Sequence, residues 1–257
     1  MAHDVFATIV GRGVIGSALA YELSDRVSGK TIVNLDKSKD HPDDKSQGPR
    51  SAGVNHPGPV YDFDTMPLKA TLCPPGNKAL WDFLAEHDLP HRRTGEFMVA
   101  NTPDEFETMT ILYAQGVANG VPGMEIWDGA QVKEVEPNIR AKKALWLPTS
   151  GVVDPVAITR KLSDIAEDRK VTMLGGTEVK GITPLGDGGF QVKVHTQGTG
   201  DNEFSSTYVF NAAGLYSDAV AAMILPEGVE PDPRMTNLFV RGEFGCFFVR
   251  PGLNVLR

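Results

Sequence analysis

Three glycines near the N-terminus are the first residues whose spacing points to chemistry. Gly11, Gly13 and Gly16 form a G-x-G-x-x-G pattern that follows the apolar run Asp4–Val10 and opens a helical pattern. In such a loop the first glycine permits a tight turn, the second lets a pyrophosphate approach the backbone, and the third lets the helix pack closely. The amino end of the helix presents unpaired N–H groups to the phosphates. The sequence therefore predicts a dinucleotide-binding βαβ unit.

An acidic residue completes the pattern at the end of the next strand. Asp36 ends the strand-like run Thr31–Asp36 and lies 20 residues after Gly16 (36 − 16). A carboxylate in that place accepts hydrogen bonds from ribose hydroxyls and repels a 2′-phosphate, so the pattern disfavours NADP. The alternative is a glycine-rich turn that binds nothing. Arg12 could reach a phosphate or point into solvent, and we expect it to point into solvent.

Composition limits the class of protein. The 257 residues are 41% hydrophobic and 23% charged, which is typical of a folded chain with one large domain or two intertwined ones. The net charge of -8 argues against binding to nucleic acid or to an anionic membrane. Cys73 and Cys246 form no C-x-x-C pair, so we expect no disulfide framework, no metal site and a reducing compartment. Both cysteines are expected to be small core residues.

Apolar runs and the N-terminal pattern bear on location. No run of about 18 apolar residues occurs, so we expect no transmembrane segment. A strand pattern already begins at Val5, which leaves no room for a signal or transit peptide and favours a cytoplasmic location.

Helix and strand patterns follow one another along the rest of the chain. Thr102 and Glu105 predict a helix start with a capping box, and Asp154-Pro155 begins another helix. Gly186–Gly189 supplies a hairpin turn. Further patterns predict a first helix with Ile15, Ala18, Leu19 and Leu23 on its inner face, a helix over 77–87, and strands over 95–100, 171–174, 178–182, 190–195 and 208–212. This order favours an α/β nucleotide-binding domain interrupted by a second domain.

Three segments resemble known FAD-dependent enzymes. Arg50–Gly58 resembles the flavin-facing loop of FAD-dependent 2-hydroxyacid and amino-acid oxidoreductases. Leu68–Cys73 resembles the L-2-hydroxyglutarate dehydrogenase (oxidase) family in particular, and Asn211–Asp218 resembles that family's second flavin-binding strand and turn. The resemblance continues through Gly76-Asn77, Glu86-His87, Gly151–Asp154, Pro231–Arg234 and Arg241–Glu243. It therefore covers nearly the whole chain in order.

The resemblance implies FAD as the cofactor and an α/β fold in which a Rossmann-like FAD-binding domain is interleaved with a substrate domain built on a mixed or antiparallel β-sheet. We assign residues 1–90 and 150–225 to the FAD-binding domain, and residues 91–149 and 226–257 to the substrate domain. Besides Gly11, Gly13, Gly16 and Asp36, the implied cofactor-binding residues are Ser51, Gly53, Val179, Ala213 and Gly214. Ser51-Ala52 departs from the family's usual Asn-Ser, which puts one polar flavin contact in doubt.

The implied reaction is oxidation of L-2-hydroxyglutarate to 2-oxoglutarate by hydride transfer to the flavin, with a small dicarboxylate as substrate and the electron acceptor left open. Such a reaction needs a base for the hydroxyl proton and cations for the carboxylates. We expect His56 to be the base and Arg241 to bind a carboxylate, the alternatives being a surface histidine and a surface strand arginine. Tyr61 and Lys69 are weaker candidates, and a solvated face suits Lys69 better.

Two other functions stay open at this stage. One is another FAD-dependent oxidase of the same fold, of the glycine or glycerol-3-phosphate type. The other is a truncated chain that binds FAD without catalysis, because the family's chains continue well beyond the position where this sequence stops. The resemblance thus implies a shortened member with weak FAD retention and little turnover. It also admits a mitochondrial location.

Overall fold

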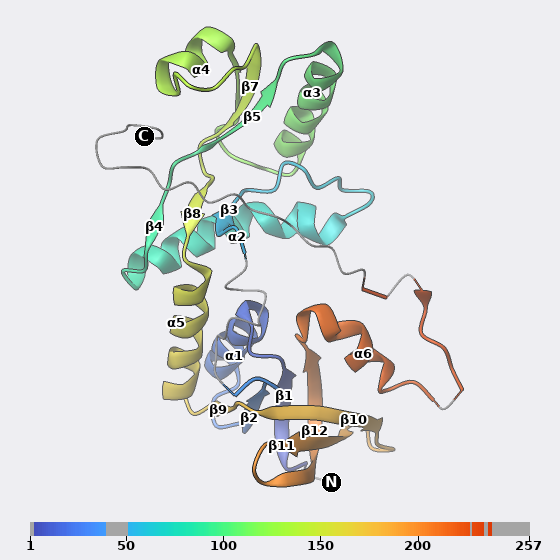
Figure 1. Cartoon of the computed structure of the whole chain (residues 1–257). Coiled ribbons are helices and arrows are strands. Elements are labelled where there is room, and N and C mark those ends of the chain that lie inside the picture. Colours follow the sequence, from blue (N-terminus) through green and yellow to red (C-terminus); the bar gives the residue numbers. More distant parts are fainter. Residues whose placement is uncertain (1–2, 40–50, 227, 234–235, 238–257) are drawn as a thin grey trace. The chain divides into compact units, whose positions relative to one another are not determined.

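The computed structural model describes residues 3–39, 51–226, 228–233 and 236–237 (Figure 1). These described residues form two compact units. One consists of the residues up to Ser51 together with those from Pro155 onward, and the other consists of Ala52–Asp154. Helices and sheets occur in both units, so the α/β class expected from the sequence is confirmed.

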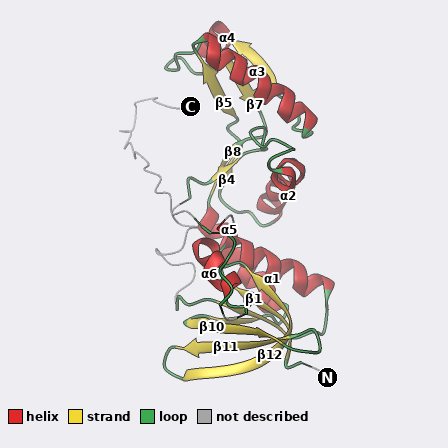
Figure 2. Ribbon diagram, turned by 90° about the vertical axis from the view of Figure 1, so that its right-hand side faces the viewer, coloured by secondary structure: helices red, strands yellow, loops and turns green. Residues whose placement is uncertain are grey.

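The first unit is built on a six-stranded mixed sheet in the order β10-β11-β12-β1-β2-β9 (Figure 2). Strands β12, β1, β2 and β9 run parallel, whereas β10, β11 and β12 pair antiparallel. The carboxyl ends of β12, β1 and β2 therefore meet at one edge, where the loop after β1 begins. The elements are β1 (Val5–Val10), α1 (Val14–Arg26), β2 (Ile32–Leu35), α5 (Pro155–Asp168), β9 (Thr172–Leu174), β10 (Thr177–Pro184), β11 (Phe190–Thr196), β12 (Gly200–Asn211), the short 3₁₀ turn Gly214–Tyr216 and α6 (Ser217–Ala222).

Small side chains let α1 approach the sheet closely. The buried residues of α1 are Gly16, Ser17 and Ala20, and Ala20 packs in one core cluster with Ile9 of β1 and Ala166 of α5. The helical face expected from the sequence was partly wrong, because Ile15 is 64% exposed, although Leu19 and Leu23 do pack against this cluster. A second hydrophobic core cluster is formed by buried side chains of the sheet, including β2 and β10, together with α6.

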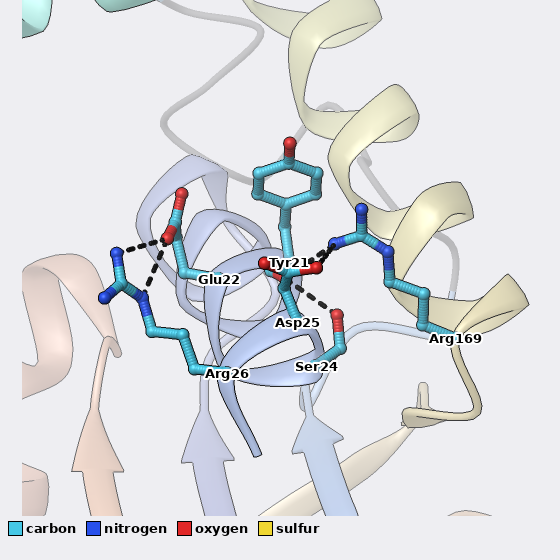
Figure 3. Close-up of polar contacts among 6 residues, drawn as sticks. All are labelled: Tyr21, Glu22, Ser24, Asp25, Arg26 and Arg169. Atoms are coloured by element: carbon cyan, nitrogen blue, oxygen red, sulfur yellow. Dashed lines mark hydrogen bonds and ion pairs between the residues drawn. The ribbon is translucent and has the colours of Figure 1, made fainter. Parts of the chain in front are cut away.

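Helices α1 and α5 are also joined by polar contacts (Figure 3). The guanidinium of Arg169 donates to the backbone carbonyl of Tyr21 at 3.2 Å. It also lies 4.8 Å from the centroid of the aromatic ring of Tyr21. Deeper in the interface, the hydroxyls of Ser17 and Ser163 are hydrogen-bonded at 2.9 Å. Because Ser17 stands one turn from the glycine loop, this contact fixes the amino end of α1.

The second unit contains two three-stranded sheets, in the orders β3-β8-β4 and β5-β7-β6. Helix α3 packs on the β5-β7-β6 sheet through Met109 and Leu145. The predicted capping box is confirmed, since Thr102 and Glu105 exchange hydrogen bonds of 3.3 and 3.0 Å. The elements are β3 (Val54–Asn55), α2 (Pro67–Glu86), β4 (His91–Arg92), β5 (Glu96–Ala100), α3 (Pro103–Ala118), β6 (Glu125–Asp128), α4 (Gly129–Val135), β7 (Lys143–Leu147) and β8 (Gly151–Val153).

Helix α2 begins ten residues earlier than the predicted start at Asn77 (77 − 67). Pro74 and Pro75 lie inside it, and prolines in a sequence usually argue against a helix interior. The helix nevertheless buries one continuous stripe at helical spacing, Ala70, Pro74, Asn77, Trp81 and Leu84. Packing of this stripe outweighs the local preference against helix.

The compact units differ in extent from the domains assigned by sequence. Residues 52–90 and 150–154 were placed with the FAD-binding domain, but here they lie in the second unit. The reason is local, because β8 pairs with both β3 and β4, and the indole of Trp81 in α2 donates to the carbonyl of Thr149. Which unit binds which ligand stays a prediction.

Candidate active site

The glycine loop after β1 needs glycine at two positions for backbone reasons. Gly11 has a φ of +104°, a conformation that favours glycine, and a Cβ there would collide with the backbone carbonyl of Ala212. A Cβ on Gly16 would collide with the carbonyl of Gly11. The third glycine of the motif therefore lets α1 approach its own loop as well as the sheet.

Gly13 is different, because a Cβ there would meet no atom of the described residues within 4 Å. It is the N-cap of α1, no side chain caps the helix, and the first turn carries no acidic residue. The first N–H groups of an α-helix have no partner within the helix, and here neither a capping side chain nor an acidic residue of the first turn competes for them. The fold itself does not require glycine at this position. A glycine next to the N–H groups of a first helical turn lets a pyrophosphate approach the backbone closely.

Two buried polar residues hold this loop, and the sequence analysis missed both. The side-chain amide of Asn34 donates to the carbonyls of Ile9 and Gly11 at 3.1 and 2.9 Å. The hydroxyl of Ser17 donates to the carbonyl of Arg12 at 3.1 Å. A signal for Asn34 was present, since it is the one polar residue within the buried strand Ile32–Leu35. Both residues keep the carbonyls of the loop turned inward.

Asp36 lies beside the loop at the end of β2. Its carboxylate accepts hydrogen bonds from the backbone N–H groups of Arg12 and Ser38, both at 2.8 Å. Each carboxylate oxygen has a second lone pair, so the group can still accept from ribose hydroxyls. The predicted acid and glycine loop are therefore adjacent in this unit.

Arg12 does not point into solvent, and that expectation was wrong. The residue is half-buried, and its Nε is fully buried with no hydrogen-bond partner among the described residues. Burial lowers the pKa of the Arg12 guanidinium, while the charges of Asp36 and Glu167 oppose this shift. Gly175 lies beside the guanidinium, since a Cβ there would come within 3.3 Å of the Arg12 Nη1.

The turn after β12 forms the other flank of the loop. The N–H of Ala212 donates to the carbonyl of Val10 at 2.8 Å, so this turn is joined to the end of β1. Gly214 has a φ of +57° and is exposed, and the side chain of Asn237 donates to its carbonyl at 3.4 Å. Ala213, also assigned to the cofactor site, packs partly against the core. The side chain of Val179 is buried in that core, so only its backbone could contact a ligand.

The loop that carries His56 lies in the second unit and is held by paired amides. The side chains of Asn55 and Asn77 each donate to the other's backbone carbonyl at 3.3 Å. Gly53 precedes them with a φ of +66°, and its carbonyl accepts from the N–H of Val153 at 2.7 Å. Gly58 follows with a φ of +83°, and a Cβ there would collide with the side chain of Cys73 on α2. The loop therefore lies directly against α2.

His56 lines a shallow, open pocket of about 320 Å³ between this loop and α2, which is called the cavity below. Lys69 and Cys73 line it as well, and the remaining lining residues are Asn55, Leu68, Leu72, Gly76 and Asn77. The ring of Tyr61 lies 5.8 Å from that of His56, and the Lys69 ammonium lies 5.2 Å from the Tyr61 centroid. Lys69 is exposed, as expected for a solvated lysine, yet it belongs to the same cavity as His56.

Burial decides the protonation of two groups at this cavity. Burial raises the pKa of the Cys73 thiol, against a smaller opposing effect of Lys69. Burial also raises the pKa of the Tyr61 phenol, and Cys73 adds to that shift. Both groups therefore stay protonated near neutral pH, and neither is suited to accept a proton there. Cys73 is half-buried rather than a core residue, and it is not a thiolate nucleophile.

Other predicted residues contribute less or lie elsewhere. Ser51 is exposed at the edge of the first unit, and Arg241 and Cys246 lie outside the described residues. Within the described ranges, no three His, Cys, Asp or Glu residues gather in a way that could hold a metal ion. In the same part of the chain, no helix has the length and apolar character to cross a membrane.

Sequence comparison connects this geometry to known proteins. The family described as DAO, FAD dependent oxidoreductase, matches residues 7–244. The mitochondrial L-2-hydroxyglutarate dehydrogenase of Caenorhabditis elegans is 30% identical over 92% of this chain and 52% of its own length. Its human counterpart is 30% identical over 92% and 50%, and a glycerol 3-phosphate dehydrogenase of Caloramator mitchellensis is 31% identical over 88% and 45%. The chain thus spans about half the length of the curated relatives it matches.

Solved structures agree with this assignment. An L-alpha-glycerophosphate oxidase from Mycoplasma pneumoniae with FAD bound superimposes with a TM-score of 0.73 at 27% identity, covering 86% of this chain and 56% of that one. A glycine oxidase from Geobacillus kaustophilus gives a TM-score of 0.70 at 21% identity, covering 86% and 58%. The second similarity concerns the fold alone.

Proposed function

The chain belongs to the family of FAD dependent oxidoreductases, and from this premise we propose that it serves the oxidation of L-2-hydroxyglutarate to 2-oxoglutarate. The observation that carries the proposal is the cavity shared by His56 and Lys69. It offers one proton acceptor and one cation in a largely apolar wall. A hydroxy acid needs both, since a hydroxyl must lose its proton while a carboxylate is held.

The residues of the first unit fit FAD. The glycine loop supplies free N–H groups at the start of α1 and open space at Gly13, and Asp36 supplies an acceptor for the ribose. Ala213 and Gly214 are proposed to border the same dinucleotide, and Val179 to contact it through its backbone. Ser51 and Gly53 are proposed to face the flavin, as the resemblance implies. When bound, FAD accepts the hydride that leaves C2 of the substrate.

The residues of the second unit are proposed to bind and orient the substrate. His56 takes the proton of the C2 hydroxyl, so that the carbonyl of the 2-oxo acid can form as the hydride leaves. Lys69 pairs with one carboxylate, and Arg241 is proposed for the other. The paired amides of Asn55 and Asn77 keep the backbone next to His56 in place.

A second candidate function is oxidation of glycerol 3-phosphate. It is favoured by the Caloramator relative and by the Mycoplasma structure, whose identities to this chain are 31% and 27%. The chemistry is closely related, because both substrates carry a secondary alcohol and an anionic group. Lys69 could pair with a phosphate as well as with a carboxylate.

The two functions are separated by anaerobic reduction of the purified flavoprotein. We expect L-2-hydroxyglutarate to bleach the oxidised flavin and to yield 2-oxoglutarate, with D-2-hydroxyglutarate, glycerol 3-phosphate and glycine as comparisons. Bleaching by glycerol 3-phosphate without any by L-2-hydroxyglutarate would reject the first function in favour of the second. Bleaching by glycine alone would reject both.

A further inference from the structure

A lysine and a tyrosine contact each other across the carboxyl end of β1. The ammonium of Lys37 lies 3.3 Å from the ring centroid of Tyr216. Lys37 follows Asp36 at the end of β2, and Tyr216 ends the turn after β12. Both side chains are exposed. Nothing in the packing of the core requires this contact.

Sheet topology decides what the contact spans. Strand β1 lies between β2 and β12, and neighbouring strands are about 4.8 Å apart, so the two flanking strands are separated by about 10 Å. At this end of the sheet β1 continues into the glycine loop. The loop touches both flanks, through Asp36 on one side and Ala212 on the other. The contact between Lys37 and Tyr216 therefore joins the two flanks at the end of the sheet where the glycine loop leaves β1.

A cation at this place has a clear chemical use. The loop offers N–H donors and open space at Gly13, but a pyrophosphate also brings negative charge close to Asp36. Arg12 is half-buried and its Nε is fully buried, so a second cation that is exposed would add to the charge that faces the phosphates. Lys37 is an exposed cation, and contact with an aromatic face holds its ammonium in one place before a ligand arrives.

We propose that Lys37, held over the glycine loop by Tyr216, is a cationic strap that binds the pyrophosphate of the dinucleotide. This inference rests on the proposed function only in taking the glycine loop as the cofactor cradle. It assigns phosphate binding to a positively charged residue that lies outside the glycine motif. Lys37 is a binding residue, and Tyr216 is a positioning residue that acts through it.

The test compares ADP with adenosine by titration calorimetry on the full chain freed of flavin. Adenosine lacks the phosphates, so it reports the ribose and adenine contacts alone. We expect Lys37→Met to weaken ADP binding about tenfold, the loss expected for one charge-assisted contact, and to reduce its dependence on salt. Adenosine binding should not change. Lys37→Arg should restore most of the ADP affinity.

A double-mutant cycle tests the role of Tyr216. Tyr216→Leu should weaken ADP binding in the wild-type background and have no further effect in the Lys37→Met background. Tyr216→Phe keeps the ring and should preserve affinity. Lys30→Met is the matched control, since Lys30 lies over Phe6 at the other end of the sheet, 5.7 Å from that centroid, and its loss should change neither ligand.

Three results would overturn the proposal, and one of them would also reject the glycine loop as the cofactor cradle. If wild-type protein binds ADP and Lys37→Met binds it equally well, the strap is rejected while the cradle stands. If wild-type protein binds neither ADP nor adenosine, the cradle and the strap are both rejected. Equal loss of ADP and adenosine binding in Lys37→Met would also reject the strap, because it would indicate a structural effect.

Discussion

The side chains of Asn55 and Asn77 form a reciprocal clamp, in which each amide donates to the other residue's backbone carbonyl at 3.3 Å. The side-chain amide of Asn77 also donates to the carbonyl of Thr149 at 3.0 Å. Both asparagines are buried, with exposures of 8% and 4%. The clamp joins the loop of His56 to the middle of α2.

Replacing Asn77 should therefore affect both stability and the candidate base. Asn77→Leu removes the donor to the carbonyl of Asn55 and one of the two side-chain donors to the carbonyl of Thr149, which should lower the free energy of unfolding by about 1–3 kcal/mol. It should also slow flavin reduction, because the backbone next to His56 is released. Chemical denaturation and stopped-flow absorbance measure the two effects. Lys78→Ala, one residue along the same helix but exposed, should change neither, and an unchanged Asn77→Leu protein would contradict the role of the clamp.

Gly13→Val should separate ligand binding from folding. A Cβ at Gly13 meets nothing within 4 Å, so the ligand-free variant should keep its stability within about 1 kcal/mol, the range of an N-cap change. Flavin content should fall sharply, because a branched side chain would occupy the place proposed for the pyrophosphate. Gly186→Val, at another open glycine in the β10–β11 turn, is the control. Full flavin content in Gly13→Val would remove the glycine loop from the cofactor site.

Arg12→Met tests the energetic consequence of a buried, unpaired donor. The substitution keeps most of the apolar stem but removes the Nε, which has no hydrogen-bond partner in the part of the chain that the structure describes. We expect the free energy of unfolding of the ligand-free protein to rise by about 1 kcal/mol. Arg26→Met, which removes an exposed arginine paired with Glu22, should stay within about 0.5 kcal/mol of wild type. A large loss of stability in Arg12→Met would show that the guanidinium makes a net favourable contribution.

The capping box of α3 predicts a pH dependence with a definite sign. Hydrogen bonds from the backbone N–H groups of Asn101 and Thr102 lower the pKa of Glu105 below its ordinary value. The folded protein therefore binds this proton less tightly than the unfolded chain. Stability gained from Glu105 is present above its unfolded pKa and is lost as the pH falls through its folded pKa.

Glu105→Gln isolates this effect, because glutamine can cap the helix without titrating. Wild type should be more stable than Glu105→Gln near neutral pH, and the difference should shrink as the pH falls below about 4. Thr102→Ala should cost about 1 kcal/mol by removing the other half of the box. Thermal melting across pH measures both, and a difference that grows in acid would contradict the sign.

Local patterns predicted the parts of the fold that local interactions determine. The glycine loop, the capping box at Thr102 and the hairpin at Gly186–Gly189 each rest on residues within a few positions of one another. Asp36 lies farther along the chain, but at the spacing that is typical of the glycine motif. The start of α2 was missed because its prolines oppose a helix locally, whereas the buried stripe that outweighs them is completed by distant partners such as Thr149.

The candidate site was predictable only in part, for the same reason. His56 was found through the resemblance of its loop, but the approach of Lys69 and Cys73 depends on α2 packing against that loop at Gly58. The guanidinium of Arg12 lies beside Gly175, a residue that is far from Arg12 in the sequence. The contact between Lys37 and Tyr216 depends on the order of strands in the sheet. No spacing rule encodes these long-range relationships.

The central claim is that this family member oxidises L-2-hydroxyglutarate through FAD with His56 as the base. The most direct measurement is anaerobic stopped-flow mixing of the purified flavoprotein with L-2-hydroxyglutarate, for wild type and for His56→Ala. We expect wild type to lose its oxidised-flavin absorbance and to form 2-oxoglutarate. His56→Ala should keep its flavin but be reduced about 10²–10⁴-fold more slowly. Wild-type flavin that stays oxidised, or a variant that is reduced as fast as wild type, would contradict this function.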